Sequence, residues 1–300
     1  MTTRYRLRSH QRHQHLNFAF VDGDHQTDFA LHKHDFSELF LVLEGSGKHL
    51  VADFEYPLSV GDVFVINGET EHGFKDVSGL KLINLMFDAS APFFEQPSMR
   101  VLAGYQTLFK IEPLARQTSE YSAKLTLNQS QLTTVQQMLE SIRSEYQVAP
   151  PGFEVMISSL MQQLIITLAR IYAQQQQDAP KTTLALSRAM VFIEQNYTRS
   201  ELTPEQIAQA AFISQRQLER LFKHYLDTSP NHYVRQLQLS YAHNLIVEEK
   251  LTSVQTISES CGFSDSNYFS KCYKQRYLTT PREEIKKGSS RISGNSKQKR

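Results

Sequence analysis

The sequence predicts an α+β protein, in which an N-terminal β-barrel is followed by helices and then by an all-α domain with two helix-turn-helix units. Apolar and polar residues alternate between about Phe29 and Phe87, with turn-forming glycines between the runs, as in the many short strands of a closed or sandwiched β fold. From Leu184 onward the apolar residues have helical spacing. Within this part, Gln217–Pro230 aligns with Tyr268–Pro281 at a shift of 51 residues, which indicates a duplicated structural unit.

Composition and charge indicate a globular protein with a C-terminal part that favours nucleic acid as a partner. The 300 residues are 40% hydrophobic and 21% charged, as in ordinary globular proteins. Residues 1–180 carry 14 Lys and Arg against 20 Asp and Glu, a net charge of −6, whereas residues 181–300 carry 18 against 11, a net charge of +7. A basic C-terminal part favours a phosphate backbone as partner.

Membrane insertion, secretion and disulfide bonding are not expected. The longest apolar run, near Leu164–Ile171, is interrupted by polar residues and is too short to span a membrane. The arginine-rich start of the chain has no apolar signal core, so we expect a cytoplasmic protein. Its two cysteines, Cys261 and Cys272, are expected to be small apolar groups rather than a disulfide or a zinc site.

Two helices are expected between the β-rich segment and the repeat. One spans about 132–146, and a longer one runs from about Phe153 to Tyr172. The longer helix has a second apolar face, formed by Ile157, Met161 and Ile165. This face either packs inside the chain or forms a dimer interface. The glutamine run at 174–177 is typical of a solvated linker.

The first repeat unit is predicted as helix, tight turn and helix. Thr203 is a candidate N-cap, with Gln206 completing a capping box. After a turn at Phe212–Ile213, Ser214 and Gln217 are expected to form a second capping box.

The second helix of this unit has an exposed polar face, formed by Gln215, Arg216, Glu219, Arg220 and Lys223. A helix-turn-helix places such a helix in the major groove of DNA. Arg216 and Arg220 are one turn apart, and an arginine can donate two hydrogen bonds to guanine. These residues are therefore candidates for DNA contacts, and the alternative is that they are solvated charges on an amphipathic helix.

The second unit presents a similar face. Ser264 or Asp265 is expected to cap its second helix, which exposes Ser266, Asn267 and Lys271. Asn267 can bond adenine in bidentate fashion, and Lys271 can reach guanine or phosphate. Asp265 has two candidate roles, accepting a hydrogen bond from cytosine or capping the helix. A helix over about 230–249 is expected to hold both units so that one protomer reads two successive major-groove faces, about 34 Å apart.

The segments "LFKHYLDTSPNHYVRQLQL" and "CGFSDSNYFSKCYKQRYLTTP" resemble the AraC family of bacterial transcription regulators. The resemblance covers about Leu184 to Lys286. Within the family, the sequence looks most similar to the L-rhamnose-responsive members. It implies that five positions contact bases or phosphates: Arg216, Arg220, Asp265, Asn267 and Lys271.

Four positions depart from the family pattern. Asp227 and Leu278 stand where the family usually has glycine after each recognition helix. Glu284 and Ile285 replace the expected aromatic or aliphatic residue and arginine. The departures put the end of the second unit in doubt, but not the fold.

The N-terminal part resembles a cupin barrel. "HKHDFSELFLVLEG" carries His32, His34 and Glu38 at the spacing of the first cupin motif, and "GDVFVINGETEH" supplies His72 like the second. Three imidazoles and a carboxylate on adjacent strands could hold a divalent metal. The alternative is a set of hydrogen-bonded histidines that line a ligand cavity.

The resemblance extends to AraC-family sensor domains, and it implies a small effector, a sugar, bound inside the barrel. The candidate ligand-binding residues are His32, His34, Glu38, Phe40 and His72, since polar groups beside an aromatic wall suit a sugar. The rival hypothesis is a metal-dependent cupin enzyme, an isomerase or dioxygenase, which would leave the DNA-binding part unexplained.

The sequence therefore predicts four regions: a ligand-sensing domain over 1–120, a helical dimerisation region and linker over 121–180, a DNA-binding domain over 181–288, and a disordered basic tail over 289–300. The expected partners are double-stranded promoter DNA, a small-molecule effector and a second copy of the chain. If the protein is an activator, RNA polymerase is a further partner. The protein is not expected to be an enzyme.

Overall fold

The computed structural model describes residues 2–88, 92–118, 124–175, 181–248 and 253–287. Its contacts divide the chain into two compact units, Met1–Ser187 and Arg188–Arg300. The basic tail predicted over 289–300 lies outside the described residues, as does most of the predicted linker, whose first two glutamines end helix α5.

The first unit is built on one eight-stranded sheet. Its strands are β1 (Thr3–Tyr5), β2 (Phe18–His25), β3 (Phe29–His34), β4 (Ser37–Val51), β5 (Phe54–Leu58), β6 (Asp62–Ile66), β7 (His72–Phe87) and β8 (Leu125–Thr126). The sheet order is β1-β3-β7-β4-β6-β8, with β2 also paired to β7 and β5 to β4. Only the β1–β3 pair is parallel among the described strands.

The predicted α+β class, with a β-rich N-terminal part and a helical C-terminal domain, is confirmed. The closure of the barrel is corrected, because the described strands at the two ends of the sheet order, β1 and β8, do not pair with each other. These end strands are only three and two residues long, which is too short to form a closing ladder.

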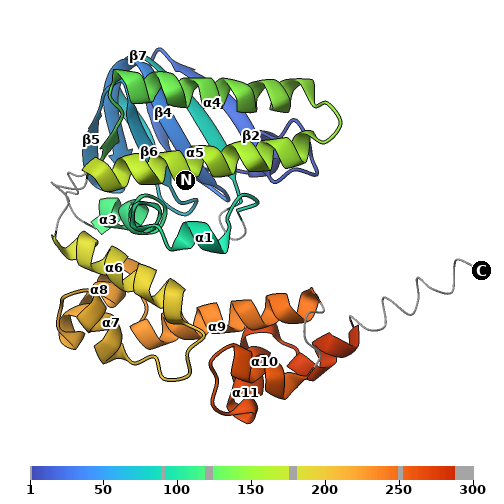
Figure 1. Ribbon diagram of the computed structural model, residues 1–300. Coiled ribbons are helices and arrows are strands. Elements are labelled where there is room, and N and C mark those ends of the chain that lie inside the picture. Colours follow the sequence, from blue (N-terminus) through green and yellow to red (C-terminus); the bar gives the residue numbers. More distant parts are fainter. Residues whose placement is uncertain (1, 89–91, 119–123, 176–180, 249–252, 288–300) are drawn as a thin grey trace, which may run out of the picture. The chain divides into compact units, whose positions relative to one another are not determined.

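Helices follow the strands in the first unit. They are α1 (Pro97–Arg100), α2 (Ala103–Tyr105), the π-helix η2 (Gln106–Ile111), α3 (Glu112–Thr118), α4 (Gln129–Val148) and α5 (Phe153–Gln175), in addition to the short 3-10 helix η1 (Leu7–Ser9). A reciprocal capping box between Asn128 and Gln131 starts α4. Helices α4 and α5 pack side by side and cover one face of the sheet (Figure 1).

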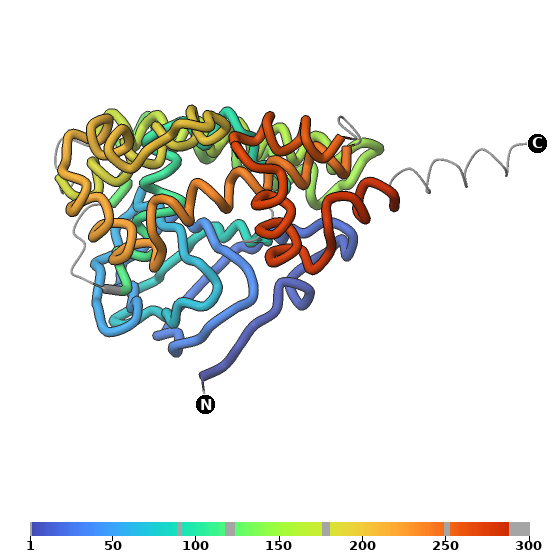
Figure 2. Tube along the Cα trace, turned by 90° about the horizontal axis from the view of Figure 1, so that it is seen from below, coloured from blue at the N-terminus to red at the C-terminus, as the bar shows by residue number. Residues whose placement is uncertain are grey.

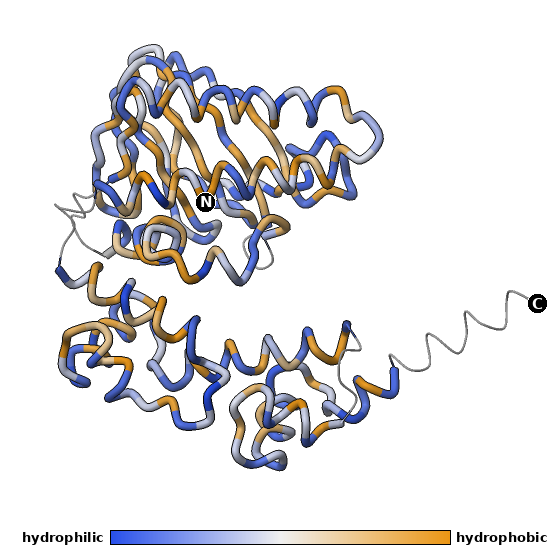
Figure 3. Tube along the Cα trace, in the orientation of Figure 1, coloured by the Kyte–Doolittle hydropathy of each residue, from blue (hydrophilic) through white to orange (hydrophobic). Residues whose placement is uncertain are grey.

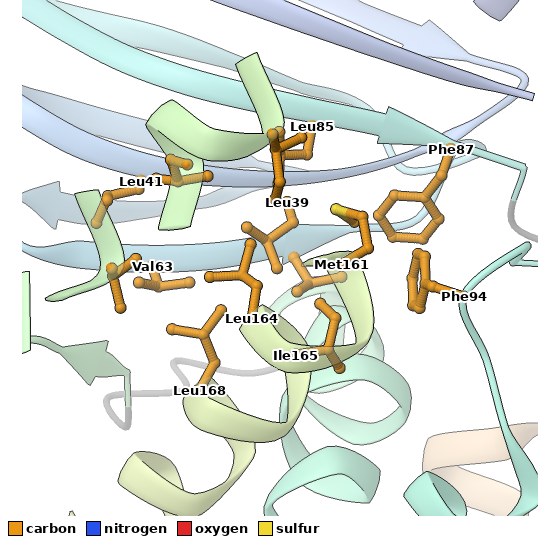
Figure 4. Packing of buried hydrophobic residues seen from close by; sticks show 14 of the residues in the cluster. Leu39, Leu41, Val63, Leu85, Phe87, Phe94, Met161, Leu164, Ile165 and Leu168 are labelled. Atoms are coloured by element: carbon orange, nitrogen blue, oxygen red, sulfur yellow. The ribbon is translucent and has the colours of Figure 1, made fainter. Parts of the chain in front are cut away.

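Alternation along the central strands gives the sheet two different faces. On β4, Leu39 and Leu41 pack into the core beneath the helices, whereas Glu38 lies on the opposite face and lines a cavity. In Figure 3, hydrophilic (blue) and hydrophobic (orange) residues alternate along these strands and along the covering helices. Figure 4 shows strand residues of the core meeting four residues of α5: Met161, Leu164, Ile165 and Leu168.

Helix α5 is buried along its second apolar face. Ile157, Met161 and Ile165 are fully buried within the single chain, so the intramolecular interpretation of the second face holds and these side chains are not available to a partner. Close packing of α2 explains part of this burial, because a Cβ at Gly104 would lie 2.0 Å from the carbonyl oxygen of Ala169. In the described part of the chain, α5 alone is long and apolar enough to cross a membrane, and 44% of its apolar window is buried within the chain.

The second unit is helical apart from its turns. Its helices are α6 (Lys181–Asn196, which starts within the first unit), α7 (Pro204–Ala210), α8 (Gln215–Leu226), α9 (Pro230–Val247), α10 (Val254–Ser260) and α11 (Ser266–Tyr277). The pairs α7–α8 and α10–α11 are the two helix-turn-helix units, and α9 runs from one to the other (Figure 2). The capping box predicted at Thr203 and Gln206 is present.

Candidate functional site

The first recognition helix, α8, begins where the sequence predicts it. The hydroxyl of Ser214 accepts a hydrogen bond from the backbone N–H of Gln217 at 3.2 Å. The predicted capping box is therefore only half formed, because the Gln217 side chain does not accept from the Ser214 N–H. Leu218, Leu221 and Phe222 are buried, so the helix turns its opposite side to solvent.

That solvent-facing side carries the predicted DNA-contacting residues of α8. Arg216, Glu219, Arg220 and Lys223 are exposed, and Gln215 is half-buried. The Gln215 amide donates to Glu219 at 3.4 Å, and Lys223 forms an ion pair with Asp227. Within the described residues the guanidinium groups of Arg216 and Arg220 have no hydrogen-bond or ion-pair partner in the chain, so both are available to DNA.

The second recognition helix, α11, presents a less charged surface. Asp265, and not Ser264, caps it, with the Asp265 carboxylate accepting from the Asn267 N–H at 2.8 Å. Asn267 and Lys271 are exposed and Ser266 is half-buried. Asp265, Ser266 and Asn267 therefore lie at the start of α11, and Lys271 lies about one turn further along the helix.

One exposed residue of α11 lies beside this group and was not predicted. Tyr268 is 49% exposed, and its neighbour Phe269 is fully buried. The sequence already contained this signal, because Tyr268 directly precedes Phe269, the residue that the helical pattern predicts to be buried.

The first unit holds a cavity of about 310 Å³ on the face of the sheet opposite α4 and α5. Its lining mixes acids and an amide with imidazole and aromatic rings: Tyr5, His10, Val21, Asp22, Gly23, Asp24, His25, Phe29, His32, Phe36, Glu38, His72, Phe74, Leu82, Asn84 and Met86. This volume is at the lower end of the range for small-molecule sites.

Four histidines and a glutamate form one polar cluster at the inner wall of this cavity. The Nε2 atoms of His34 and His72 are 2.9 Å apart, and His49 Nε2 is 3.2 Å from His72 Nδ1. One Glu38 oxygen lies 3.6 Å from the Nε2 atoms of both His34 and His72. Nitrogen atoms of His32, His34 and His72 all lie within 4.8 Å of one another.

Burial sets the protonation of the cluster. It lowers the pKa of His34 to about 4 and holds the pKa values of His49 and His72 well below the usual range. Burial also raises the pKa of Glu38 to about 7, against a hydrogen bond from Asn84 that lowers it. The imidazoles are therefore neutral at neutral pH, as imidazoles that bind a metal ion must be.

The five predicted ligand-binding residues occupy different places. His32, Glu38 and His72 line the cavity. His34 is fully buried behind them and touches His72. Phe40 does not reach the cavity and packs against the rings of His49, Phe64 and Phe74.

Six polar residues of the cavity were not predicted from the sequence: Tyr5, His10, Asp22, Asp24, His25 and Asn84. His49 was also missed, although it completes the cluster. It lies in the second half of the long strand β4, and antiparallel pairing of β4 with β7 brings it diagonally next to His72. Nothing in the local pattern around these residues distinguishes them from ordinary strand or loop residues.

Two family models match the two parts of the chain. The model described as "AraC-like ligand binding domain" matches residues 15–165, which is half of the chain, and the model described as "Helix-turn-helix domain" matches residues 207–287. The chain belongs to the AraC family. The resemblance predicted from the sequence is thereby confirmed.

Curated relatives of this AraC-family chain match along most of its length. The transcriptional activator RhaS of Pectobacterium carotovorum subsp. carotovorum (strain PC1) is 27% identical over 257 residues, covering 86% of this chain and 88% of that protein. The transcriptional activator RhaR of Enterobacter sp. (strain 638) is 28% identical over 264 residues, covering 88% and 89%. Relatives and domains are those of transcription regulators rather than enzymes, so the enzyme hypothesis is set aside.

Solved structures match as well. An AraC-type transcriptional regulator from Chromobacterium violaceum is 38% identical, with a TM-score of 0.32, over 35% of this chain and 91% of that chain. ToxT from Vibrio cholerae O395 is 11% identical, with a TM-score of 0.33, over 90% of this chain and 97% of that chain. By its two family models, this AraC-family protein is a DNA-binding transcription regulator with a ligand-binding domain.

Proposed function

We propose that the protein activates transcription in response to a sugar that binds in the N-terminal cavity. Helices α8 and α11 are proposed to read two successive major grooves of promoter DNA, through the exposed residues at their starts. The relatives named above are activators by name, and their names also suggest a sugar effector.

Unsatisfied polar atoms in the cavity carry the effector proposal. The Asn84 Oδ1 and His10 Nε2 atoms are buried and have no hydrogen-bond partner among the described residues, and both residues belong to the cavity wall. A buried polar atom without a partner costs about 1–3 kcal/mol. A ligand that offers hydroxyl groups would satisfy both atoms and recover that cost.

The rest of the lining suits a polyhydroxylated ring. Asp22 and Asp24 offer carboxylates that accept hydrogen bonds from hydroxyl groups, and Phe29, Phe36 and Phe74 provide apolar walls. Polar groups at a few fixed positions give specificity, while aromatic walls cover the carbon faces of the ligand.

The donor set also fits a divalent transition-metal ion. His32 and His34 donate their Nδ1–H groups to the carbonyl oxygens of Ala30 and Phe36, at 3.0 and 2.5 Å, which leaves both Nε2 lone pairs free. His32, His34, His72 and Glu38 would hold the ion, whose chemistry would be to polarise a hydroxyl group of the effector.

A hydrogen-bonded cluster is the second state of the same residues. In this state His72 donates its Nε2–H to His34 Nε2, and His72 Nδ1 accepts from His49 Nε2–H. The acceptor His49 Nδ1 then has no partner among the described residues. Metal content of untagged protein separates the two states: one ion per chain supports the metal site, and none supports the hydrogen-bonded lining.

The proposed assembly is a cytoplasmic homodimer that contacts RNA polymerase when it activates. Because the second apolar face of α5 is buried within the chain, a dimer must use another surface. Effector binding can change transcription only through different affinities for the arrangements of the two DNA-binding domains.

Calorimetric titration of the full-length protein with a panel of monosaccharides tests the effector proposal. One sugar is expected to bind at one site per chain, and Asn84→Ala is expected to weaken it about five- to fiftyfold by removing a cavity hydrogen bond. Gln137→Ala, which removes an exposed amide on α4, is the matched control. Equal affinities of the wild type and Asn84→Ala would contradict a sugar site in this cavity.

A further inference from the structure

The turn of the second helix-turn-helix unit is held by an arginine from the helix that precedes it. The Arg235 guanidinium carbon lies 4.4 Å from the ring centroid of Phe263 and 5.1 Å from that of Tyr268. Phe263 belongs to the turn between α10 and α11, and Tyr268 to the first turn of α11. Arg235 on α9 is therefore stacked directly on the start of the second recognition helix.

The same guanidinium is tied, through Gln238 on α9, to the segment that follows α6. Its Nη1 donates to Gln238 Oε1 at 2.9 Å, and Gln238 Nε2 donates to the Tyr197 carbonyl oxygen at 2.7 Å. Gln238 is only 4% exposed, so both of its hydrogen bonds are sheltered from water. The chain after α6, helix α9 and the second turn thus meet through two side chains.

Close backbone approach strengthens this junction. Gly262 has a φ of +82°, and a Cβ on it would lie 2.6 Å from the Thr198 carbonyl oxygen and 2.9 Å from Gln238 Nε2. The second turn therefore lies directly against the segment that follows α6. Only glycine fits here, because both the backbone conformation and the available space exclude a side chain.

The turn of the first helix-turn-helix, between α7 and α8, contacts helix α6. The Arg188 guanidinium carbon on α6 lies 5.5 Å from the ring centroid of Phe212, in the turn between α7 and α8. Phe222 of α8 packs against Tyr233 of α9, with ring centroids 5.7 Å apart. Each turn therefore carries an arginine on an aromatic ring, and at the second turn the buried amide of Gln238 adds a polar bridge.

We infer that Arg235 is a positioning residue for DNA recognition, which fixes the second recognition helix relative to the first so that both enter adjacent major grooves. This inference rests on the proposed DNA contacts of α8 and α11. Two helices on one rigid body read two grooves together only if their separation and angle match the helical repeat of DNA, about 10–10.5 base pairs.

Spacing provides a readout that a merely stabilising role would not change. A duplex selected by the wild-type protein from a randomised pool serves as the probe. Inserting one base pair between its two contacted segments shifts the second by about 3.4 Å along the axis and by about 35° around it. The wild type is expected to bind this shifted duplex more weakly, by about tenfold or more, as for the loss of a base contact.

In Arg235→Ala, the affinity for the selected duplex is expected to fall about tenfold, as for the loss of one base contact, while the preference over the shifted duplex nearly vanishes. Binding to a duplex with a scrambled second segment is expected to stay at the wild-type level. Arg235→Lys keeps the charge but loses planar stacking, so it should behave like Arg235→Ala. Arg188→Ala, at the corresponding stack of the first turn, is the control and should retain the spacing preference.

Two results would overturn the inference. One is an Arg235→Lys protein, folded by circular dichroism, that keeps the wild-type spacing preference. The other is an Arg235→Ala protein that weakens equally on the scrambled duplex, since this would make Arg235 a phosphate contact. A selection that enriches no sequence would instead overturn the proposed function itself.

Discussion

Asp227 and Leu278 end the two recognition helices in the same left-handed conformation, with φ values of 46° and 59°. Both positions are the C-caps where the family pattern has glycine, and their N–H groups bond to the carbonyl oxygens of Phe222 and Lys274. The departures predicted from the sequence thus preserve the turn geometry, at the conformational cost of a side chain with positive φ.

Replacing Leu278 with glycine is expected to stabilise the second helix-turn-helix unit by about 1 kcal/mol, because glycine adopts this conformation without strain. Leu278 is 89% exposed, so little packing is lost. Hydrogen exchange of α11 amides measures the effect. Gln275→Gly, at an exposed site inside α11, is the control and should destabilise by about 1 kcal/mol. Slower exchange in the control than in Leu278→Gly would contradict the argument.

Arg216 and Arg220 are expected to provide specific contacts and not only charge. Replacing either one with lysine keeps the charge but removes the bidentate geometry, so the discrimination between the selected site and random DNA should fall by about 1–3 kcal/mol. Competition gel shifts measure this ratio. Equal loss on specific and random DNA would show that the two arginines contact phosphates only.

Asp265 has a capping role in the structure, and the family resemblance adds a role in base recognition. Asp265→Ser should keep the cap, as Ser214 does in α8, but lose about 1–3 kcal/mol of discrimination at one cytosine. Asp265→Ala should lose this discrimination and also about 1 kcal/mol of helix stability. Binding to single-base variants of the site, measured beside thermal unfolding, separates the roles. If Asp265→Ser kept the full discrimination at that cytosine, capping would be the only role of Asp265.

A buried ion pair within α3 is hydrogen-bonded to Tyr172, near the end of α5. Arg116 Nη2 lies 3.4 Å from Glu112 Oε2, and Tyr172 donates to Glu112 Oε1 at 2.5 Å. Glu112→Gln should destabilise the first unit by about 3 kcal/mol, because the buried guanidinium loses this negative charge. The double replacement Glu112→Leu with Arg116→Met should be more stable than Glu112→Gln, since apolar pairs of similar volume often substitute well, but less stable than the wild type, since Tyr172 loses its acceptor on Glu112.

Hydrogen exchange of α5 and β6 amides in the full-length protein measures both effects. A single variant as stable as the wild type would show that the carboxylate is not needed for burial of the arginine. A double variant less stable than the single one would show that the pair itself stabilises the unit.

The C-terminal unit was predictable because its signals are local. Thr203 and Ser214 are each followed within a few residues by the helix that they cap. The repeat at a shift of 51 residues then marks the corresponding elements of the second unit. The second turn contains one residue more than the first, and this explains why Asp265 rather than Ser264 is the N-cap that follows it.

The cavity was only partly predictable because it depends on contacts between distant residues. His32, Glu38 and His72 follow motif spacing, but His10 and Asn84 come from segments far apart in the sequence. The helices over 97–118 were also not predicted. They are short and include a π-helix, and this disrupts the 3.6-residue periodicity on which helix prediction depends.

Methylation protection of guanine N7 atoms on a selected duplex reports directly whether α8 and α11 enter the DNA, since N7 lies in the major groove. We expect two protected clusters for each bound chain, about 10–10.5 base pairs apart. The cluster read by α8 should disappear in the Arg216→Ala, Arg220→Ala double variant, and the cluster read by α11 should remain. A single cluster in the wild-type protein, or protection that does not depend on sequence, would contradict two recognition helices in neighbouring grooves.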